Sequence, residues 1–445
     1  MSSNRDSFHS RIGFILAAAG AAIGLGNIWG FPTQAANNGG GAFVFVYLIV
    51  TVLLAIPALY AEMYIGNQAQ KNPVGALEDA CENVSKKLGK YAGLFGLLGA
   101  ILMLSFYTIV AGWMLAHALS PLMTLLGFDN TANWLAQSSH ARNLAFTPIF
   151  IILGALIINN GVHKGIERWS SRLMPILFVL LIGLIIYILQ QPGASKGVAM
   201  YLMPDFSQLK DPMLIISAMG QAFFSLSIGV GGMMVYGSYM KRNADMGKLV
   251  ISIGALDTLI AFLAGLLIIP TLFVAQHMGL EVFSEGKLIG GPQLIFSILP
   301  TLFDSMGSIG IYVSLVFFSL MSMAALTSTI SSTEVPVSYL VEDKKYSRSK
   351  ATAVVSLIVL VACMSIVFNF DSLFGAVITW VNSFQLPIMG LFYFIVVGWI
   401  WKRGNQLADK SLLAEKPMLK VLGNYLRYVC PILLSIVFIN VLMNL

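Results

Sequence analysis

Stretches of about 20 apolar residues recur along the chain, and each is as long as a helix must be to cross the hydrocarbon core of a bilayer. Of the 445 residues, 57% are hydrophobic and only 10% are charged, and the mean hydropathy is +0.82. This composition excludes a water-soluble globular domain. We predict an all-α polytopic membrane protein, a single transmembrane domain over residues 1–445, with about eleven spans. The predicted spans cover residues 12–36, 41–68, 91–126, 146–161, 166–190, 211–240, 244–276, 306–339, 351–368, 373–401 and 425–443.

Basic residues are unevenly distributed between the loops that join these spans. If the N-terminus is cytoplasmic, all but four of the 26 Lys and Arg residues fall on the inner side. The four exceptions are Arg142, Lys196, Lys210 and Lys287. Positive charge accumulates in cytoplasmic loops, so this distribution predicts a cytoplasmic N-terminus and an external C-terminus. The net charge of +6 comes from scattered loop residues, which predicts contact with membrane lipid but no nucleic-acid partner and no obligate protein partner.

The first predicted span has the length of a transmembrane helix but also features that interrupt one. Between Ala17 and Pro32 it contains four glycines, and the proline closes the segment. Within a membrane, unwound backbone is tolerated only where it is buried in protein or lines a cavity. Such a break therefore predicts a binding site for a cation or a polar solute. The alternative is that these small residues let helices pack closely.

The sixth predicted span repeats this pattern, because Gln221 to Gly232 is rich in serine and glycine. Matching interruptions in spans five apart are the sequence signature of an inverted repeat, and they favour a binding site over close packing. We therefore predict a first repeat of helices 1–5 (residues 12–190), a second repeat of helices 6–10 (residues 211–401) and an additional helix 11 (residues 425–443).

These segments carry a family resemblance. The run from Gly20 to Pro32, then Asn38-Gly39-Gly40-Gly41-Ala42-Phe43, and later Phe223-Phe224-Ser225-Leu226-Ser227 and Ala325-Leu326-Thr327-Ser328, resembles the neurotransmitter:sodium symporter family in its bacterial amino-acid branch. The match is colinear over nearly the whole chain. It implies the LeuT fold, a 5+5 inverted repeat with unwound helices 1 and 6. It also implies sodium-coupled amino-acid uptake by alternating access in the bacterial cytoplasmic (inner) membrane.

The resemblance further implies two Na⁺ ions, and a hard cation of this kind requires oxygen ligands. One ion would be held by the carbonyls of Gly20, Ile23 and Ala324 and the hydroxyls of Thr327 and Ser328. The other would be held by the Ala22 carbonyl, Asn27, Ser225, Asp257 and the carboxylate of the substrate. The alternative for the two hydroxyls of helix 8 is that they bond back to their own helix, as is common in membrane helices.

Asp257 lies in an otherwise apolar run, where an ionisable side chain is costly and is functional by default. The alternative is that it faces the inner loop beside Lys248. Because chloride-dependent relatives bind an anion near this point, a built-in carboxylate predicts transport that does not need chloride. The residues matching the chloride pocket, Tyr47, Gln221 and Ser225, are nevertheless present, which leaves vestigial anion binding open.

Gly24 limits the class of possible substrates. It stands where amine-transporting relatives place an acid, so the ligand should bring its own carboxylate. By resemblance, Leu25 and Gly26 amides and the Tyr107 hydroxyl would bind that carboxylate, and the ammonium would meet backbone of Ala22, Phe224, Ser225 and Ser227. The side-chain pocket would consist of Met103, Ser227, Val230, Ser328 and Ser332 under a Phe224 lid. This neutral pocket predicts a hydrophobic or aromatic L-amino acid. The alternative is that Tyr107 and Phe224 are ordinary core residues.

Gate residues are also implied by the resemblance. On the outside, Gly30 and Phe374 replace a charge pair of the family, which predicts closure through apolar contacts of Phe224 and Phe374. On the inside, Arg5 would pair with Glu342 or Asp343 near Tyr239. Gly165 and Pro175 match a fifth-helix motif proposed to unwind, because proline removes a helical hydrogen bond; a simple kink is the alternative.

Three rival classes remain on sequence grounds. A membrane enzyme is disfavoured because the five histidines are dispersed and no pairing of nucleophile and base can be argued. A receptor of similar fold would bind the same ligands without accumulating them. A channel is disfavoured because coupled sites under a lid imply an occluded site rather than a continuous pore.

Overall fold

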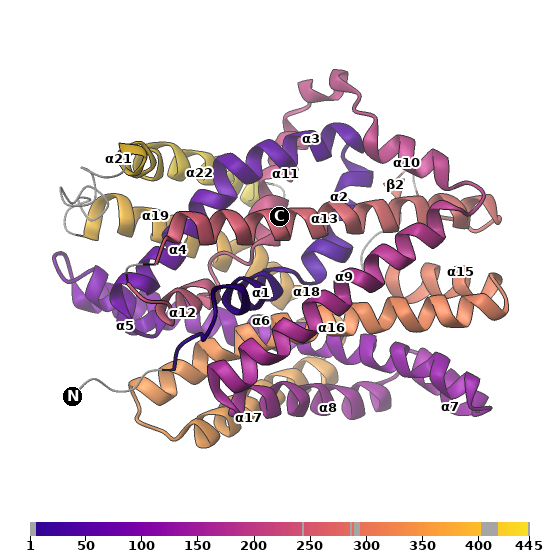
Figure 1. Cartoon of the computed structure of the whole chain (residues 1–445), viewed down its shortest axis with the longest axis horizontal. Coiled ribbons are helices and arrows are strands. Elements are labelled where there is room, and N and C mark those ends of the chain that lie inside the picture. Colours follow the sequence, from indigo (N-terminus) through magenta and orange to yellow (C-terminus); the bar gives the residue numbers. More distant parts are fainter. Residues whose placement is uncertain (1–5, 243, 285–286, 289–293, 402–416, 444–445) are drawn as a thin grey trace.

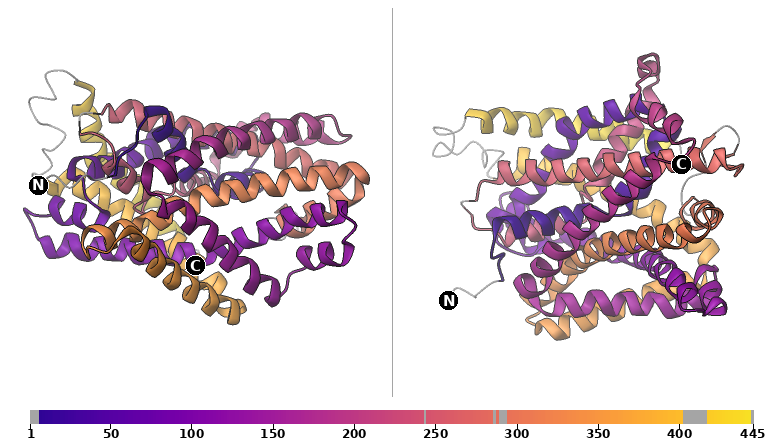
Figure 2. Two further views of the ribbon diagram at one scale, coloured as in Figure 1. Left: turned by 60° about the horizontal axis from the view of Figure 1, so that its bottom comes forward. Right: turned by 45° about the vertical axis from the view of Figure 1, so that its right-hand side comes forward.

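The computed structural model describes residues 6–242, 244–284, 287–288, 294–401 and 417–443. Figures 1 and 2 show long helices running side by side along one direction, with the N-terminus at one end of the bundle; Figure 1 places α7 (Asp129–Ala136) and α15 (Leu299–Ser305) at the other. The described strands are β1 (Phe283–Ser284) and β2 (Lys287–Leu288), paired antiparallel with Phe283 opposite Leu288. Over the described ranges the fold is therefore helical apart from this hairpin.

Nine helices in the described ranges are long and apolar enough to cross a membrane. They are Gly41–Ala69 (α3, η2 and α4), Lys86–Leu125 (α6), His140–Asn159 (α8), Val162–Leu189 (η3 and α9), Met246–His277 (α13), Ser308–Glu342 (α16), Arg348–Phe368 (α17), Phe370–Ile400 (α18, η6, α19 and η7) and Val421–Met443 (parts of α21, with η9 and α22). Shorter elements are α5 (Pro73–Ala80), α10 (Ala194–Leu202), η4 (Phe206–Lys210) and η5 (Leu294–Ile298).

The two remaining predicted spans are interrupted. The first consists of α1 (Arg11–Ala22) followed by η1 (Gly26–Gly30) and α2 (Phe31–Asn37), with a bend of 56°. The sixth consists of α11 (Pro212–Ser225) and α12 (Gly232–Ser238), each too short to cross a bilayer alone. Of the eleven predicted spans, nine are therefore continuous, a tenth counts as one bent pair, and 211–240 is not one helix.

Several spans begin earlier than predicted because a polar residue caps the helix before its apolar part starts. Ser85 accepts from the Leu88 N–H, which starts α6 at Lys86 rather than at residue 91. Ser139 accepts from the Arg142 N–H, which starts α8 at His140 rather than at residue 146. Capping hydroxyls satisfy helix N–H groups that have no partner within the helix, so helices extend beyond their hydrophobic windows.

Glycines in this bundle serve both functions that the sequence left open. In the break between α11 and α12, Gly229 and Gly231 have φ of 101° and 90°, a conformation that ends a helix and favours glycine. Between α4 (Ile56–Ala69) and α12, a Cβ at Gly66 or Gly237 would overlap backbone carbonyls of the facing helix. Glycine thus breaks one segment and lets two other helix backbones touch.

Candidate functional site

The breaks in the first and sixth spans lie against each other in the interior. Gln221 Nε2 donates to the Gly26 carbonyl at 3.0 Å, and a Cβ at Gly26 would lie 3.0 Å from the Phe224 ring. The first break is joined to α6 as well, because Leu25 N donates to Tyr107 Oη at 3.4 Å. The unwound segments are therefore held in contact from separate elements, as a binding site at broken helices requires.

Oxygen atoms of α1 and α16 gather beside the first break. Ser328 Oγ donates to the Ile23 carbonyl at 3.0 Å and lies 3.4 Å from the Gly20 carbonyl. Thr327 Oγ1 donates to the Ala324 carbonyl at 3.0 Å, and a Cβ at Gly20 would lie 3.2 Å from Thr327 Cβ. Thr327 thus bonds back to its own helix, whereas Ser328 reaches across to α1. All five residues predicted for the first ion meet at this contact.

Asp257 forms a second oxygen cluster and is 0% exposed. Its Oδ1 accepts from Asn27 Nδ2 at 2.7 Å, and its Oδ2 accepts from Ser225 Oγ at 2.9 Å. Asn27 Nδ2 also lies 2.9 Å from Ser225 Oγ. Asn27 Oδ1 accepts from the Gly24 N–H at 3.1 Å, which links this cluster to the first break.

Asp257 has no basic partner within the part of the chain that the structure describes, and its contacts are with uncharged groups. The alternative that it faces an inner loop beside Lys248 is wrong, because Lys248 instead pairs with Asp245 at 3.5 Å on the exposed surface. Tyr47 Oη lies 3.4 Å from Ser225 Oγ, so two residues of the resembled chloride pocket meet at this cluster, Ser225 within it and Tyr47 beside it. A buried carboxylate with only neutral partners is energetically costly.

The residues predicted for the substrate pocket come from four elements around the breaks. Met103 and Tyr107 are buried on α6, and Ser328 and Ser332 are buried on α16. Val230 is buried in the α11–α12 break, and Ser227 there has φ of 51°. A Cβ at Gly24 would lie 2.7 Å from Tyr107 Oη and 2.8 Å from Ser328 Oγ. The hydroxyls of α6 and α16 therefore converge on Gly24. Ala22 is the last residue of α1, and its carbonyl lies at the break.

Sequence reasoning missed another buried acid, Glu62 on α4. Its carboxylate accepts from the Gly229 N–H at 2.9 Å and from the Met234 N–H at 3.4 Å. Gln385 Nε2 donates to the Gly229 carbonyl at 3.0 Å from the other side. Together Glu62 and Gln385 hold the second break open. The signal was present, since Glu62 is the only acid in the predicted span 41–68 and intramembrane acids are functional by default.

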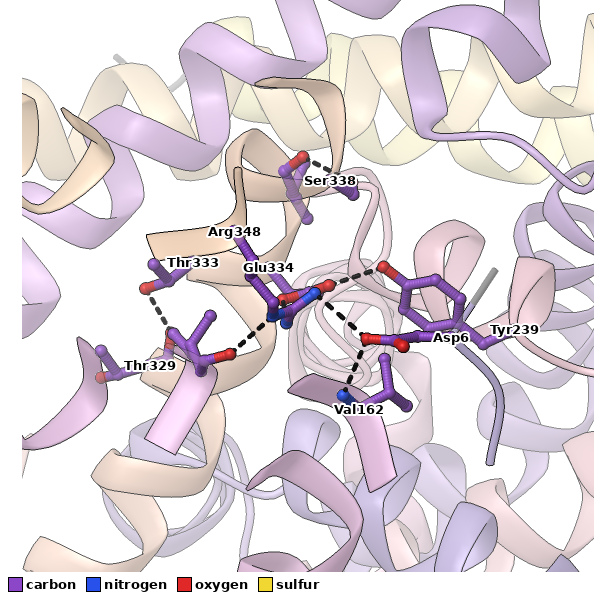
Figure 3. A network of polar contacts seen from close by, with 10 residues as sticks. Asp6, Val162, Tyr239, Thr329, Thr333, Glu334, Ser338 and Arg348 are labelled. Carbon is purple, nitrogen blue, oxygen red and sulfur yellow. Dashed lines mark hydrogen bonds and ion pairs between the residues drawn. The ribbon is translucent and has the colours of Figure 1, made fainter. Parts of the chain in front are cut away.

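Polar contacts close the end of the bundle where the N-terminal segment lies (Figure 3). The fully buried Glu334 pairs with Arg348 Nη2 at 2.5 Å and accepts from Tyr239 Oη at 2.6 Å. Arg348 Nη1 lies 3.6 Å from Asp6, and its Nε donates to the Ile158 carbonyl at 2.7 Å. This network around the ion pair thereby joins five separate parts of the chain.

Of the described residues predicted for the inner gate, this network contains only Tyr239. Arg5, the predicted cation of that gate, lies outside the described residues. Glu342 accepts from the backbone N–H of Asn72 at 2.6 Å, and Asp343 accepts from Asn72 Nδ2 at 2.8 Å. Tyr239 instead bonds to Glu334, which the sequence analysis did not place in the gate. The glutamate and arginine sit 14 residues apart on α16 and α17, and nothing in the local pattern pairs them.

A separate latch ties the N-terminal segment to the start of the fifth span. Glu167 accepts from the His9 N–H at 2.8 Å, from the Ser10 N–H at 3.0 Å and from Ser10 Oγ at 2.9 Å, and it pairs with His163 at 3.0 Å. Gly165 lies in η3 (Val162–Glu167), and Pro175 lies inside α9 (Arg168–Leu189), which stays helical around it. Unwinding of this helix remains a prediction.

The opposite end of the bundle carries an aromatic cavity of about 670 Å³. Phe374 stacks on Phe370 with ring centroids 4.5 Å apart and lies 5.7 Å from Trp113. Gly30 does not border this cavity; a Cβ there would lie 3.5 Å from Gln221 Oε1. The predicted apolar outer gate thus has aromatic side chains around Phe374, while Gly30 belongs to the break below.

Two interrupted helices in contact, with buried oxygen clusters beside the first break, are the arrangement expected of a polytopic membrane transporter. A profile of the sodium:neurotransmitter symporter family matches residues 5–147 and 139–445, and the chain belongs to that family. The predicted family and fold class are thereby confirmed, and the protein is a transporter rather than an enzyme.

Relatives match over nearly their whole length. An uncharacterized sodium-dependent transporter of Haemophilus influenzae is 31% identical over 464 residues, with 98% of each chain covered. The uncharacterized sodium-dependent transporter YhdH of Bacillus subtilis is 32% identical over 450 residues, with 97% of each covered. The crystal structure of MhsT in complex with L-phenylalanine superimposes with a TM-score of 0.82 at 36% identity, covering 98% of this chain and 100% of that one. The fold is therefore that of MhsT.

Proposed function

We propose that the protein is a sodium-coupled symporter that imports a neutral, hydrophobic or aromatic L-amino acid by alternating access. The observation that carries this proposal is the buried Asp257 carboxylate, whose partners in the described chain are an amide and a hydroxyl. Burying a carboxylate without a countercharge is costly. Na⁺ would neutralise it and would be coordinated by the oxygen atoms that surround it.

Two Na⁺ ions would bind at the two oxygen clusters. The first would replace the hydrogen bonds that Ser328 and Thr327 now donate, using the carbonyls of Gly20, Ile23 and Ala324. The second would use the Ala22 carbonyl, Asn27, Ser225 and Asp257, with the substrate carboxylate completing its shell. Because that carboxylate would touch both the ion and the broken helix, neither ligand would bind well alone, which is the basis of coupling.

The substrate would bind where the breaks meet Tyr107. Its carboxylate would accept from the Leu25 and Gly26 N–H groups and from Tyr107, and its ammonium would meet carbonyls at the Ser225 end of α11. The pocket has a glycine at position 24 and serines at 328 and 332, which favours a large uncharged side chain. The complex of MhsT with L-phenylalanine, at 36% identity, supports a substrate of this type.

Alternating access would use the two differently built ends of the molecule. The end with the N-terminal segment is closed by the Glu334–Arg348 pair and by Glu167, whereas the other end carries the 670 Å³ aromatic cavity. Opening of the closed end would require Asp6 and His9 to leave their partners. Unwinding between Gly165 and Pro175 would release the same turn that carries Glu167. The distribution of positive charge favours a cytoplasmic position for this end.

The test is uptake of a panel of radiolabelled amino acids into proteoliposomes. We expect accumulation of aromatic and large aliphatic amino acids with an inward Na⁺ gradient and none with an equal K⁺ gradient. Liposomes without protein and the D257N variant serve as controls. Binding of substrate without accumulation would favour a receptor and contradict the proposal.

Chloride dependence is tested in the same vesicles. Because Asp257 supplies a fixed negative charge, replacing chloride with gluconate on both sides should change the initial rate less than about twofold. A loss of uptake that chloride restores would instead assign an anion to the pocket bordered by Tyr47 and Ser225.

A further inference from the structure

Three basic residues line one face of the fifth span at its start. Lys164, Arg168 and Arg172 follow one another at intervals of four residues, which places them one above another on a helix. All three side chains are exposed, and no carboxylate pairs with them in the described part of the chain. The nearest acid in sequence, Glu167, is buried and faces His9 and Ser10 instead. No described residue therefore neutralises this basic face.

A cavity of about 450 Å³ lies at this face. It is lined by His163, Lys164, Glu167, Arg168 and Ser171. The Glu167 oxygens that border it already accept hydrogen bonds from two backbone N–H groups, from Ser10 Oγ and from His163. The cations and the Ser171 hydroxyl therefore remain to bind an occupant, and their charge selects an anion.

The same face continues as exposed apolar surface toward the middle of the membrane. Ile176, Val179 and Ile186 are 48%, 67% and 55% exposed. Between them Gly183 leaves a gap, since a Cβ at that position would meet nothing within 4 Å. Arg172 to Gly183 spans about 16 Å of helix, roughly half of the ~30 Å hydrocarbon thickness. A basic cradle followed by an apolar track of one leaflet's depth has the dimensions of a phospholipid.

We propose that this face of η3 and α9 is a binding site for an anionic phospholipid, whose phosphate lies between Lys164, Arg168 and Arg172 and whose acyl chain follows Val179 and Gly183. The occupied turn is also the turn whose buried side holds the N-terminal segment through Glu167. Bound lipid therefore stabilises the closed end of the transporter. A soluble anion would use the cations but would gain nothing from the apolar track.

The experiment compares binding of phosphatidylglycerol and phosphatidylcholine to the full-length protein by native mass spectrometry in detergent. We expect the wild type to prefer phosphatidylglycerol and R168Q/R172Q to lose about 25-fold of that preference, because each surface cation contributes about fivefold. The matched control is K87Q/K90Q, which removes two exposed cations at the start of α6. The control should change the preference less than threefold.

The charge-conserving variant R168K/R172K should retain most of the preference, and size-exclusion profiles establish that every variant is folded. Equal losses in R168Q/R172Q and K87Q/K90Q would mean only general attraction to a basic surface and would overturn the proposal. An unchanged preference in R168Q/R172Q would also overturn it. So would displacement of the lipid by millimolar inorganic phosphate, because that would make the site one for a soluble anion.

Discussion

Two fully buried carboxylates, Asp257 on α13 and Glu334 on α16, are satisfied in different ways. Glu334 pairs with Arg348 at 2.5 Å, so the chain supplies its countercharge. Asp257 accepts hydrogen bonds from Asn27 and Ser225 only, and its charge is not neutralised by any described residue. A buried carboxylate is costly unless it is paired, hydrogen-bonded, protonated or bound to a cation; Glu62, which is also fully buried, accepts from backbone N–H groups. The comparison therefore separates a structural ion pair at the closed end from an acid suited to binding a transported cation.

The largest effect should come from removing the countercharge of Glu334. We expect R348Q to destabilise the protein by about 3–5 kcal/mol, because it leaves a buried carboxylate unpaired. The double variant E334Q/R348Q should recover most of that loss. Thermal unfolding in detergent measures both, with K87Q as a surface control. If the double variant is no more stable than R348Q, the pair is not what makes Arg348 important.

Asp257 should respond in the opposite sense. We expect D257N to keep or slightly raise the thermal stability in sodium-free buffer, since it removes an unpaired buried charge. Its sodium-dependent uptake should fall about 100-fold, and the stabilisation of the protein by added Na⁺ should shrink. If D257N keeps the normal Na⁺ affinity, Asp257 does not bind the transported cation. Its role would then be structural, like that of Glu334.

A substitution of Ser328 tests the oxygen cluster between α1 and α16, where the first Na⁺ is proposed to bind. We expect S328A to raise the Na⁺ concentration for half-maximal uptake about tenfold, the effect of losing about 1.4 kcal/mol from one oxygen ligand. T329A is the matched control, because Thr329 Oγ1 bonds only to the Ala325 carbonyl of its own helix, at 2.8 Å. Equal shifts in the two variants would indicate a general effect on α16.

The smallest effect should come from the N-terminal latch. We expect E167Q to weaken the closed end by about 1 kcal/mol, since the amide keeps the geometry but loses charge-assisted hydrogen bonds to His9 and Ser10. A cysteine placed at Phe8, whose partly buried ring packs against Phe14 and Tyr236, should then react with a water-soluble thiol reagent about fivefold faster. The same cysteine with Glu167 intact gives the reference rate. A slower reaction would contradict the assignment of Glu167 as a latch.

Much of the proposed first ion site could be predicted because the family motif spans its residues. Gly20, Ile23, Thr327 and Ser328 were expected together and do meet between α1 and α16. The motif could not tell which hydroxyl crosses between helices, since Thr327 and Ser328 are adjacent and equally able to bond back. The alternative for Asp257 was open for a similar reason, because its position along one helix does not reveal the direction in which the side chain points.

The residues that sequence reasoning missed are those whose partners are distant. Glu62 binds the backbone of Gly229, and Glu167 binds the backbone of His9 and Ser10, at separations of 167 and more than 150 residues. Every residue except proline has a backbone N–H, so nothing in the sequence marks which of them will bind a distant acid. The pairing becomes visible only when the folded chain brings the acid to the free N–H groups of a helix break or helix start. Helix starts were misplaced for a local reason, since caps at Ser85 and Ser139 extend helices past their apolar windows.

The sequence by itself determined that this chain lies in a membrane and that its first and sixth spans break. These properties depend on runs of about 20 residues and on glycine positions, both of which are local. Only the tertiary structure decided which buried acid has a cation of its own. Arg348 reaches Glu334 because α16 and α17 fold back beside each other, whereas Asn27, Ser225 and Asp257 are brought together from three spans. Charge pairing at that range is a property of packing and cannot be read along one segment.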